Sequence, residues 1–103
     1  MIVKDKIKKG DIQPPFSKAV ADIGREIVSF DCELHADCAD ELLGDGSNPG
    51  DLWGFNIYPD GHIDFVSLLN IRPAVGNRSM EIKNQEICDK IESIVGKLLT
   101  NDQ

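Results

Sequence analysis

The sequence predicts an α+β fold with two layers, in which a largely antiparallel sheet of three or four strands carries helices packed on one face. Three observations predict this class. Apolar and polar residues alternate on both sides of a turn at residues 59–62, two other segments repeat apolar residues at helical spacing, and 41% of the 103 residues are hydrophobic while 28% are charged. This length fits one domain spanning residues 1–103, with the element order β-α-β-α-β-β-α.

The N-terminal part is expected to form a strand followed by a helix. Residues 2–7 alternate and carry lysines on one side, which is typical of a short edge strand. A helix is expected over residues 15–29, because Pro15 suits a first helical turn and apolar residues follow at helical spacing. These apolar residues are Phe16, Ala19, Val20, Ile23, Ile27 and Val28.

The stretch 30–41, FDCELHADCADE, holds five carboxylates, two thiols and one imidazole. Residues 30–36 alternate between apolar and polar, which predicts a half-buried strand with Cys32 and Leu34 on its inner face. Asp37 is then expected to cap a short helix that begins at Cys38 and ends at Gly44 or Gly46. This interpretation makes the stretch ordinary structure.

Two metal sites are the alternatives to that interpretation. Zinc would need Cys32, His35 and Cys38 to converge, but the odd spacing on a strand sends Cys32 and His35 to opposite faces. Alternatively, the HxD pattern at residues 35–37 recurs at residues 62–64, so that the two pairs would meet around a divalent ion if their segments were neighbours in the sheet. Two HxD matches are a weak signal, and polar residues facing solvent explain each pair, so we expect no metal and no cofactor.

The second half predicts a hairpin and a helix. Alternation over residues 53–58 and 63–71 flanks a Pro59-Asp60-Gly61-His62 turn, and the return strand is apolar on both sides in its middle. Pro73 and Gly76 break the following segment. Asn84 is expected to cap the last helix. Its apolar stripe contains Ile87, Ile91, Ile94, Val95 and Leu98, and Cys88 lies beside it.

Charge and cysteine content narrow the classes of partner. A formal net charge of −7 opposes binding to nucleic acid, since such binding depends on Lys and Arg at the phosphates. No apolar run is long enough to span a membrane and no signal peptide opens the sequence, so we expect a soluble, cytoplasmic protein. The three cysteines form no CxxC pair, and reduced thiols are expected.

Several motifs resemble those of a family of short, uncharacterised prokaryotic proteins, a domain of unknown function. They are ELHAD, LWGxNxYP and NIRPxxGNRS, and with His35 and Asp37 they cover most of the chain after residue 30. The matching residues are Leu52, Trp53, Gly54, Asn56, Tyr58 and Pro59, then Asn70, Ile71, Arg72, Pro73, Gly76, Asn77, Arg78 and Ser79. The resemblance implies no activity, but it implies that several polar residues belong to the shared motifs, and packing of a hydrophobic core does not require such residues. The ligand-binding candidates are therefore His35, Asn56, Arg72, Asn77 and Arg78.

Two functions follow as hypotheses. The first is an interaction module that forms a homodimer or docks a protein partner through its sheet face or edge, with Trp53, Tyr58, Val66 and Leu68 as interface candidates. The second is a small-anion or phosphate-ligand site in the loop at residues 72–79, where two arginines and backbone N–H groups offer donors. Neither a nucleotide-binding loop nor a GxSxG nucleophile motif is present, so no reaction can be named.

Overall fold

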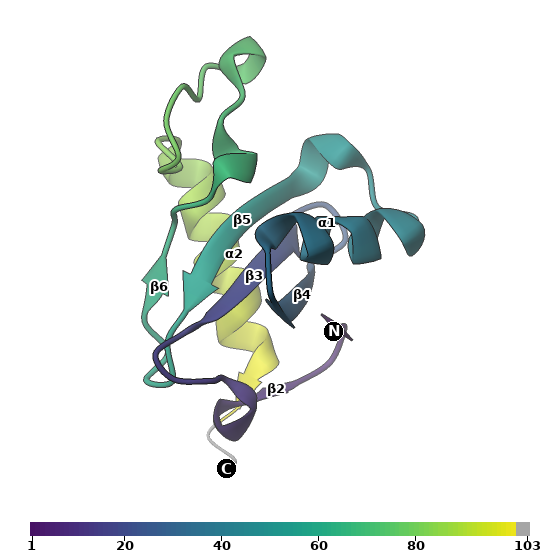
Figure 1. Ribbon diagram of the computed structural model, residues 1–103, viewed down its shortest axis with the longest axis vertical. Helices are drawn as coiled ribbons and strands as arrows, with labels where there is room; N and C mark the ends of the chain where they lie inside the picture. Colours follow the sequence, from purple (N-terminus) through teal and green to yellow (C-terminus); the bar gives the residue numbers. More distant parts are fainter. Residues whose placement is uncertain (101–103) are drawn as a thin grey trace.

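The strands span Ile2–Val3 (β1), Ile7–Lys8 (β2), Ser17–Asp22 (β3), Ile27–Cys32 (β4), Leu52–Ile57 (β5), Ile63–Asp64 (β6) and Leu99–Thr100 (β7), and the helices span His35–Gly44 (α1) and Gln85–Leu98 (α2). The computed structural model describes residues 1–100. Five strands form an antiparallel sheet in the order β1-β4-β3-β5-β6, and β2 pairs with β7 in parallel (Figure 1). None of the helices in this described part is long and apolar enough to cross a membrane.

The two helices cover opposite faces of the sheet, with α1 in front of the strands and α2 behind them in Figure 1. The core under α2 contains Ala19, Ala21, Val28, Phe30, Trp53, Phe55 and Ile57 from the strands and Ile91, Ile94, Val95 and Leu98 from the helix. The core under α1 contains Val20, Ile27 and Leu52 from the strands and Cys38, Ala39 and Leu42 from the helix. The α+β class and the antiparallel sheet are thus confirmed, whereas the helices do not share one face.

The helix expected over residues 15–29 is wrong, because this segment forms the hairpin of β3 and β4. Both strands are covered by helices on two sides, so apolar residues occupy consecutive positions and imitate helical spacing. The turn between the strands is held by Asp22, whose Oδ1 accepts hydrogen bonds from the N–H groups of Gly24 and Arg25, both at 2.9 Å. The expected element order therefore loses its first helix.

A bulge at Asp31 changes which face the end of β4 presents. Phe30 pairs with Ala19, but Cys32 pairs with Lys18, so one residue of β4 is left over and its φ is +64°. Phe30 therefore faces α2 while Cys32 faces α1, although regular alternation would have placed them on the same side. The strand expected over residues 30–36 accordingly stops at Cys32.

Helix α1 begins three residues earlier than expected. Leu34 occupies the N-cap position, and Asp37 lies inside the first turn rather than before it. Its Oδ2 accepts a hydrogen bond from the Leu34 N–H at 3.2 Å, which fixes the free end of the helix. As a result, His35 is the first helical residue and lies over the sheet.

The second half agrees more closely with expectation. Strand β5, the turn after it and the Asn84 cap of α2 are confirmed, with Asn84 Oδ1 accepting from Glu86 N–H at 2.9 Å and Ile87 N–H at 3.3 Å. The return strand is wrong beyond Asp64, because β6 has only two residues and the chain then forms a 3-10 turn at Leu68–Asn70. The residues after Asp64 are apolar on both sides because they belong to a loop that packs across β5, and not because they form a central strand.

Replacing Ile91 by Ala should destabilise the protein by about 2 to 5 kcal/mol, because its side chain is fully buried between α2 and the sheet. Chemical denaturation measures the midpoint of unfolding. Glu92→Ala is the matched control, since Glu92 is exposed on the next position of α2. Equal midpoints for the two variants would show that the apolar face of α2 is assigned incorrectly.

The bulge predicts an unusual substitution pattern at Asp31. Because its φ is +64°, Asp31→Val should destabilise the protein by about 1 to 2 kcal/mol, whereas Asp31→Gly should leave the stability unchanged or raise it. Thermal unfolding of the two variants compares them directly. A valine variant as stable as the glycine variant would contradict the left-handed conformation.

Candidate ligand-binding site

A pocket of about 390 Å³ lies where the start of α1, the ends of β3 and β5, and the segment after β6 meet. Its lining is mostly apolar. It consists of Phe16, Lys18, Leu34, His35, Ala36, Asn56, Val66, Ser67, Leu68, Leu69 and Met80. Two ligand-binding candidates, His35 and Asn56, and two interface candidates, Val66 and Leu68, are therefore brought together in one place.

Gly54 of β5 allows the pocket walls to approach each other. A Cβ atom at this position would lie 2.5 Å from the side chain of Ser67 and 3.4 Å from Cδ2 of His35. Ser67 can pack over β5 only because this position carries no side chain, whereas His35 lies at ordinary contact distance. The glycine of the LWGxN motif is thus a requirement of packing at the pocket floor.

A buried amide fastens the segment after β6 to β5. Asn70 accepts a hydrogen bond from Gly54 N–H at 2.8 Å through Oδ1, and its Nδ2 donates to the carbonyl oxygens of Gly54 at 2.9 Å and Met80 at 3.1 Å. Its side chain is fully buried. Asn70 therefore holds both Ser67 and Met80 in place as pocket walls.

Asn77, a ligand-binding candidate, has its amide engaged inside the loop. Its Nδ2 donates to the carbonyl oxygens of Asn70, Ser79 and Glu81 at 2.6, 3.0 and 3.1 Å. Its Oδ1 accepts from Lys83 N–H at 2.8 Å. These bonds give Asn77 a clear role in shaping the loop.

Arg72 is also engaged by the protein itself. Its guanidinium lies 4.3 Å from the centre of the Trp53 ring and donates to the carbonyl oxygens of Leu69, Gly50 and Leu52. Burial lowers the pKa of the guanidinium from its ordinary value. Arg72 lines a separate hollow of about 540 Å³, and the exposed Arg78 is not part of that lining. The structure does not bring the two arginines into one pocket.

His35 is held at the pocket by one ring nitrogen. Its Nε2 lies 2.9 Å from the carbonyl oxygen of Phe55, which only accepts hydrogen bonds, so Nε2 carries a proton and Nδ1 is the acceptor of the neutral ring. Burial lowers the pKa of His35 most strongly, and the contacts with Phe55 and Asn56 partly oppose this effect. The neutral imidazole is therefore the favoured form at neutral pH.

Asn56 contributes an acceptor without a partner. The residue is 8% exposed, and its Oδ1 is buried without a hydrogen bond of normal geometry from any described residue, although the His35 ring lies close enough to interact with the Asn56 side chain. It lies on the same face of the sheet as Gly54 and opposite Lys18 on β3. Buried polar atoms are nearly always paired, so an unpaired acceptor in a pocket lining indicates a position for a ligand donor.

The remaining interface candidates lie elsewhere. Trp53 is 4% exposed and packs under α2 on the opposite face of the sheet. Tyr58 is half-buried in a row of rings, 5.3 Å from Phe16 and 5.3 Å from His62. Phe16, Lys18 and Met80 were missed as pocket residues, because they come from distant parts of the chain and no local motif marks them.

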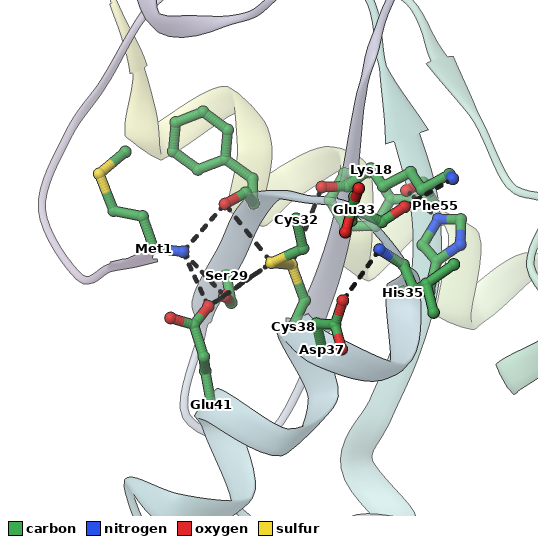
Figure 2. Close-up of a disulfide and its surroundings, with 12 residues drawn as sticks. Met1, Lys18, Ser29, Cys32, Glu33, His35, Asp37, Cys38, Glu41 and Phe55 are labelled. Carbon is green, nitrogen blue, oxygen red and sulfur yellow. Dashed lines mark hydrogen bonds and ion pairs between the residues drawn. A yellow bond between two sulfur atoms is a disulfide. The ribbon is translucent and has the colours of Figure 1, made fainter.

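The cysteines differ from expectation, because Cys32 and Cys38 form a disulfide, with Cα atoms 5.8 Å apart, and only Cys88 is free (Figure 2). The bulge that turns Cys32 toward α1 makes this bond possible. In the described part of the chain, Cys32, Cys38 and Glu41 are the one group of three possible metal ligands close enough to share an ion. The two HxD pairs do not form such a group.

Comparisons with known proteins identify the family without a function. A family model described as "Protein of unknown function (DUF5674)" matches residues 2–98. The resemblance to a domain of unknown function is thereby confirmed. Neither a curated protein nor a solved structure matches the chain.

The lowered pKa of His35 predicts a loss of stability in mild acid. Because the unfolded chain has the ordinary pKa of about 6.5, it takes up a proton before the folded state does. The stabilising effect of the neutral ring is complete above about pH 6.5 and is lost as the pH falls through the lower folded pKa. His35→Gln should weaken this pH dependence in denaturation experiments, while the exposed control His62→Gln should retain it. The same pH profile in wild type and His35→Gln would contradict the assignment.

Proposed function

Since the chain belongs to the DUF5674 family, which is described as of unknown function, we propose from its own geometry that it is a binding protein. Its ligand is a small, mainly apolar molecule or group that carries an N–H or O–H donor. The site is the pocket defined by His35 and Asn56. This proposal differs from the expected interaction module, which forms a homodimer or docks a protein partner through its sheet face or edge, because its site is a pocket at the start of α1.

The buried, unpaired Oδ1 of Asn56 is the observation that carries the proposal. Leaving a buried acceptor without a partner costs about 1 to 3 kcal/mol, and a ligand donor would recover that cost. An apolar molecule without a donor gains nothing from this atom. The unpaired acceptor therefore makes the pocket selective for molecules that can donate.

The walls favour an apolar body. Ligand pockets usually enclose about 300 to 1,000 Å³, and this pocket of about 390 Å³ lies in that range. Leu34, Leu68 and Met80 at its rim are 59%, 72% and 41% exposed. Covering such surface stabilises a complex by about 25 cal/mol for each Å² removed from water. Met80 can also adapt its shape to different ligands.

The alternative, a small-anion or phosphate site at residues 72–79, has less support. Arg72 donates to three backbone carbonyls and lies over Trp53, so most of its hydrogen-bonding capacity is used. Arg78 is exposed and lies outside the lining of the hollow that contains Arg72. A rigid, paired guanidinium site for an anion is not assembled from these two residues.

Indole and benzofuran provide a direct test, because they have nearly the same shape but only indole has an N–H donor. We expect indole to shift the NMR signals of His35, Asn56 and Ser67 and to bind about ten times more tightly than benzofuran. Asn56→Leu should remove this difference, since the side chain keeps its approximate size but loses the acceptor. Arg78→Ala, which lies outside the pocket lining, is the control and should not change indole binding.

Two outcomes would overturn the proposal. One is equal binding of indole and benzofuran to the wild-type protein. The other is a preference for indole over benzofuran that persists in Asn56→Leu. A parallel titration with inorganic phosphate covers the alternative, and shifts at residues 72–79 that disappear in Arg78→Ala would favour the anion site.

A further inference from the structure

We propose that the Cys32–Cys38 disulfide is a reversible thiol–disulfide exchange site that controls the order of the pocket wall formed by residues 33–37. The effect of the disulfide on the order of residues 33–37 does not depend on the proposed function. The effect of the disulfide on ligand binding rests on the proposed function. The oxidised protein is the form that binds, and reduction loosens the pocket.

The position of the disulfide connects it to the pocket. It links the last residue of β4 to the fourth residue of α1, with a sequence separation of 6. Leu34, His35 and Ala36 lie between the two cysteines, and all three line the pocket. Figure 2 shows the disulfide between Glu41 on one side and His35 on the other. The bond therefore closes a small loop that carries the pocket wall.

Few other contacts hold this loop to the sheet. Leu34, Ala36 and Asp37 are exposed, and Cys38 is the first buried residue of α1. The hydrogen bonds with neighbouring strands include the His35 bond to Phe55 O at 2.9 Å and the Lys18 Nζ bond to Glu33 O at 2.8 Å, and His35 also contacts Asn56. Segments with little buried apolar surface open easily, so the covalent bond has a large share in ordering this one.

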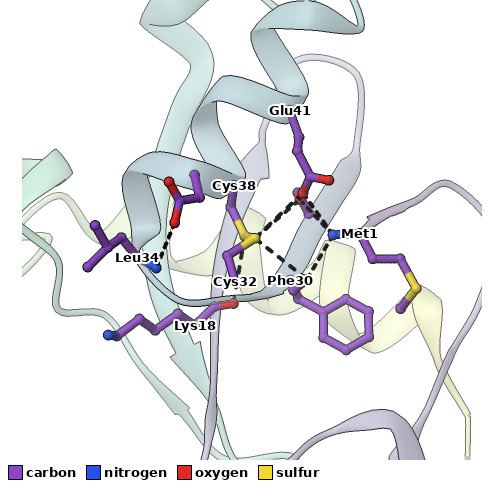
Figure 3. Close-up of polar contacts among 9 residues, drawn as sticks. Met1, Lys18, Phe30, Cys32, Leu34, Cys38 and Glu41 are labelled. Atoms are coloured by element: carbon purple, nitrogen blue, oxygen red, sulfur yellow. Dashed lines mark hydrogen bonds and ion pairs between the residues drawn. A yellow bond between two sulfur atoms is a disulfide. The ribbon is translucent and has the colours of Figure 1, made fainter.

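The reduced form can keep its fold, because each released thiol has an acceptor close by. Cys32 Sγ lies 3.5 Å from Glu41 Oε1 and 3.8 Å from Phe30 O, and Cys38 Sγ lies 3.9 Å from Lys18 O (Figure 3). Glu41 Oε1 is itself held by Ser29 Oγ at 2.6 Å. Reduction therefore places two thiols where acceptors already exist, rather than burying them without partners.

In the exchange reaction, a dithiol compound reduces the Cys32–Cys38 disulfide and is itself oxidised. Its thiolate attacks Cys32 Sγ, because Cys32 is partly exposed while Cys38 is fully buried. A mixed disulfide forms, and Cys38 leaves as a thiolate that takes up a proton. The second thiol of the reductant then displaces Cys32, so the protein gains two electrons and two protons and the dithiol becomes a disulfide. Oxidation by a disulfide compound reverses these steps.

The change in order can be measured without any ligand. In Cys88→Ala, which removes the third thiol, thiol alkylation should count no free thiols after oxidation and two after treatment with dithiothreitol. Hydrogen exchange by NMR should then show faster exchange at residues 33–38 in the reduced protein. Amides of α2 should remain equally protected in both states, since α2 packs on the other face of the sheet. A double variant, Cys32→Ser with Cys38→Ser, should reproduce the reduced pattern.

The outcomes separate this inference from the proposed function. Global unfolding on reduction, or identical exchange at residues 33–38 in both states, would overturn the exchange site. Indole should bind about ten times more weakly to the reduced protein, because the pocket loses its preorganised wall. Unchanged indole affinity despite the altered exchange would overturn the control of binding. If indole binds neither form while exchange still changes on reduction, the exchange site is supported and the proposed function fails.

Discussion

The close contact between Gly54 and the chain after β6 is the constraint on which the rest of the structure depends. Ser67 occupies the space that a side chain at position 54 would fill, and Asn70 forms hydrogen bonds with both the N–H and the carbonyl of Gly54. This contact sets the path of residues 66–83, and Asn77 then closes the loop behind it. The hollow lined by Arg72 and the pocket lined by His35 are both consequences of that path.

The bulge at Asp31 has an equally wide effect on the other side of the pocket. A single extra residue turns Cys32 from the α2 face to the α1 face. The bulge therefore allows Cys32 to form a disulfide with Cys38 of α1. This bond fixes where the first turn of the helix meets the sheet. A position with an uncommon backbone conformation thus helps to position a pocket residue, His35, that lies four positions further along the chain.

Local patterns predicted some elements well. Strand β5 and the Asn84 cap of α2 depend on residues close together in the sequence, and both were found. The β3–β4 hairpin was missed because Ala19, Val20 and Ala21 are buried on both faces, which removes the alternation of a strand. The bulge leaves no periodic signal, so the Cys32–Cys38 bond was missed as well. His35 and Asn56 belong to the family motifs, but their meeting with Phe16 and Met80 depends on tertiary contacts.

Because α2 is the last helix, the order of synthesis matters for this protein. The face of the sheet that carries Phe30 and Phe55 is covered by residues 85–98, which leave the ribosome after all the strands of the sheet. Until then, a newly made chain has one helix-covered face and one open apolar face. Such intermediates associate readily with one another, so docking of α2 protects the chain from aggregation. The cap at Asn84, which stabilises the start of α2, contributes to this protection.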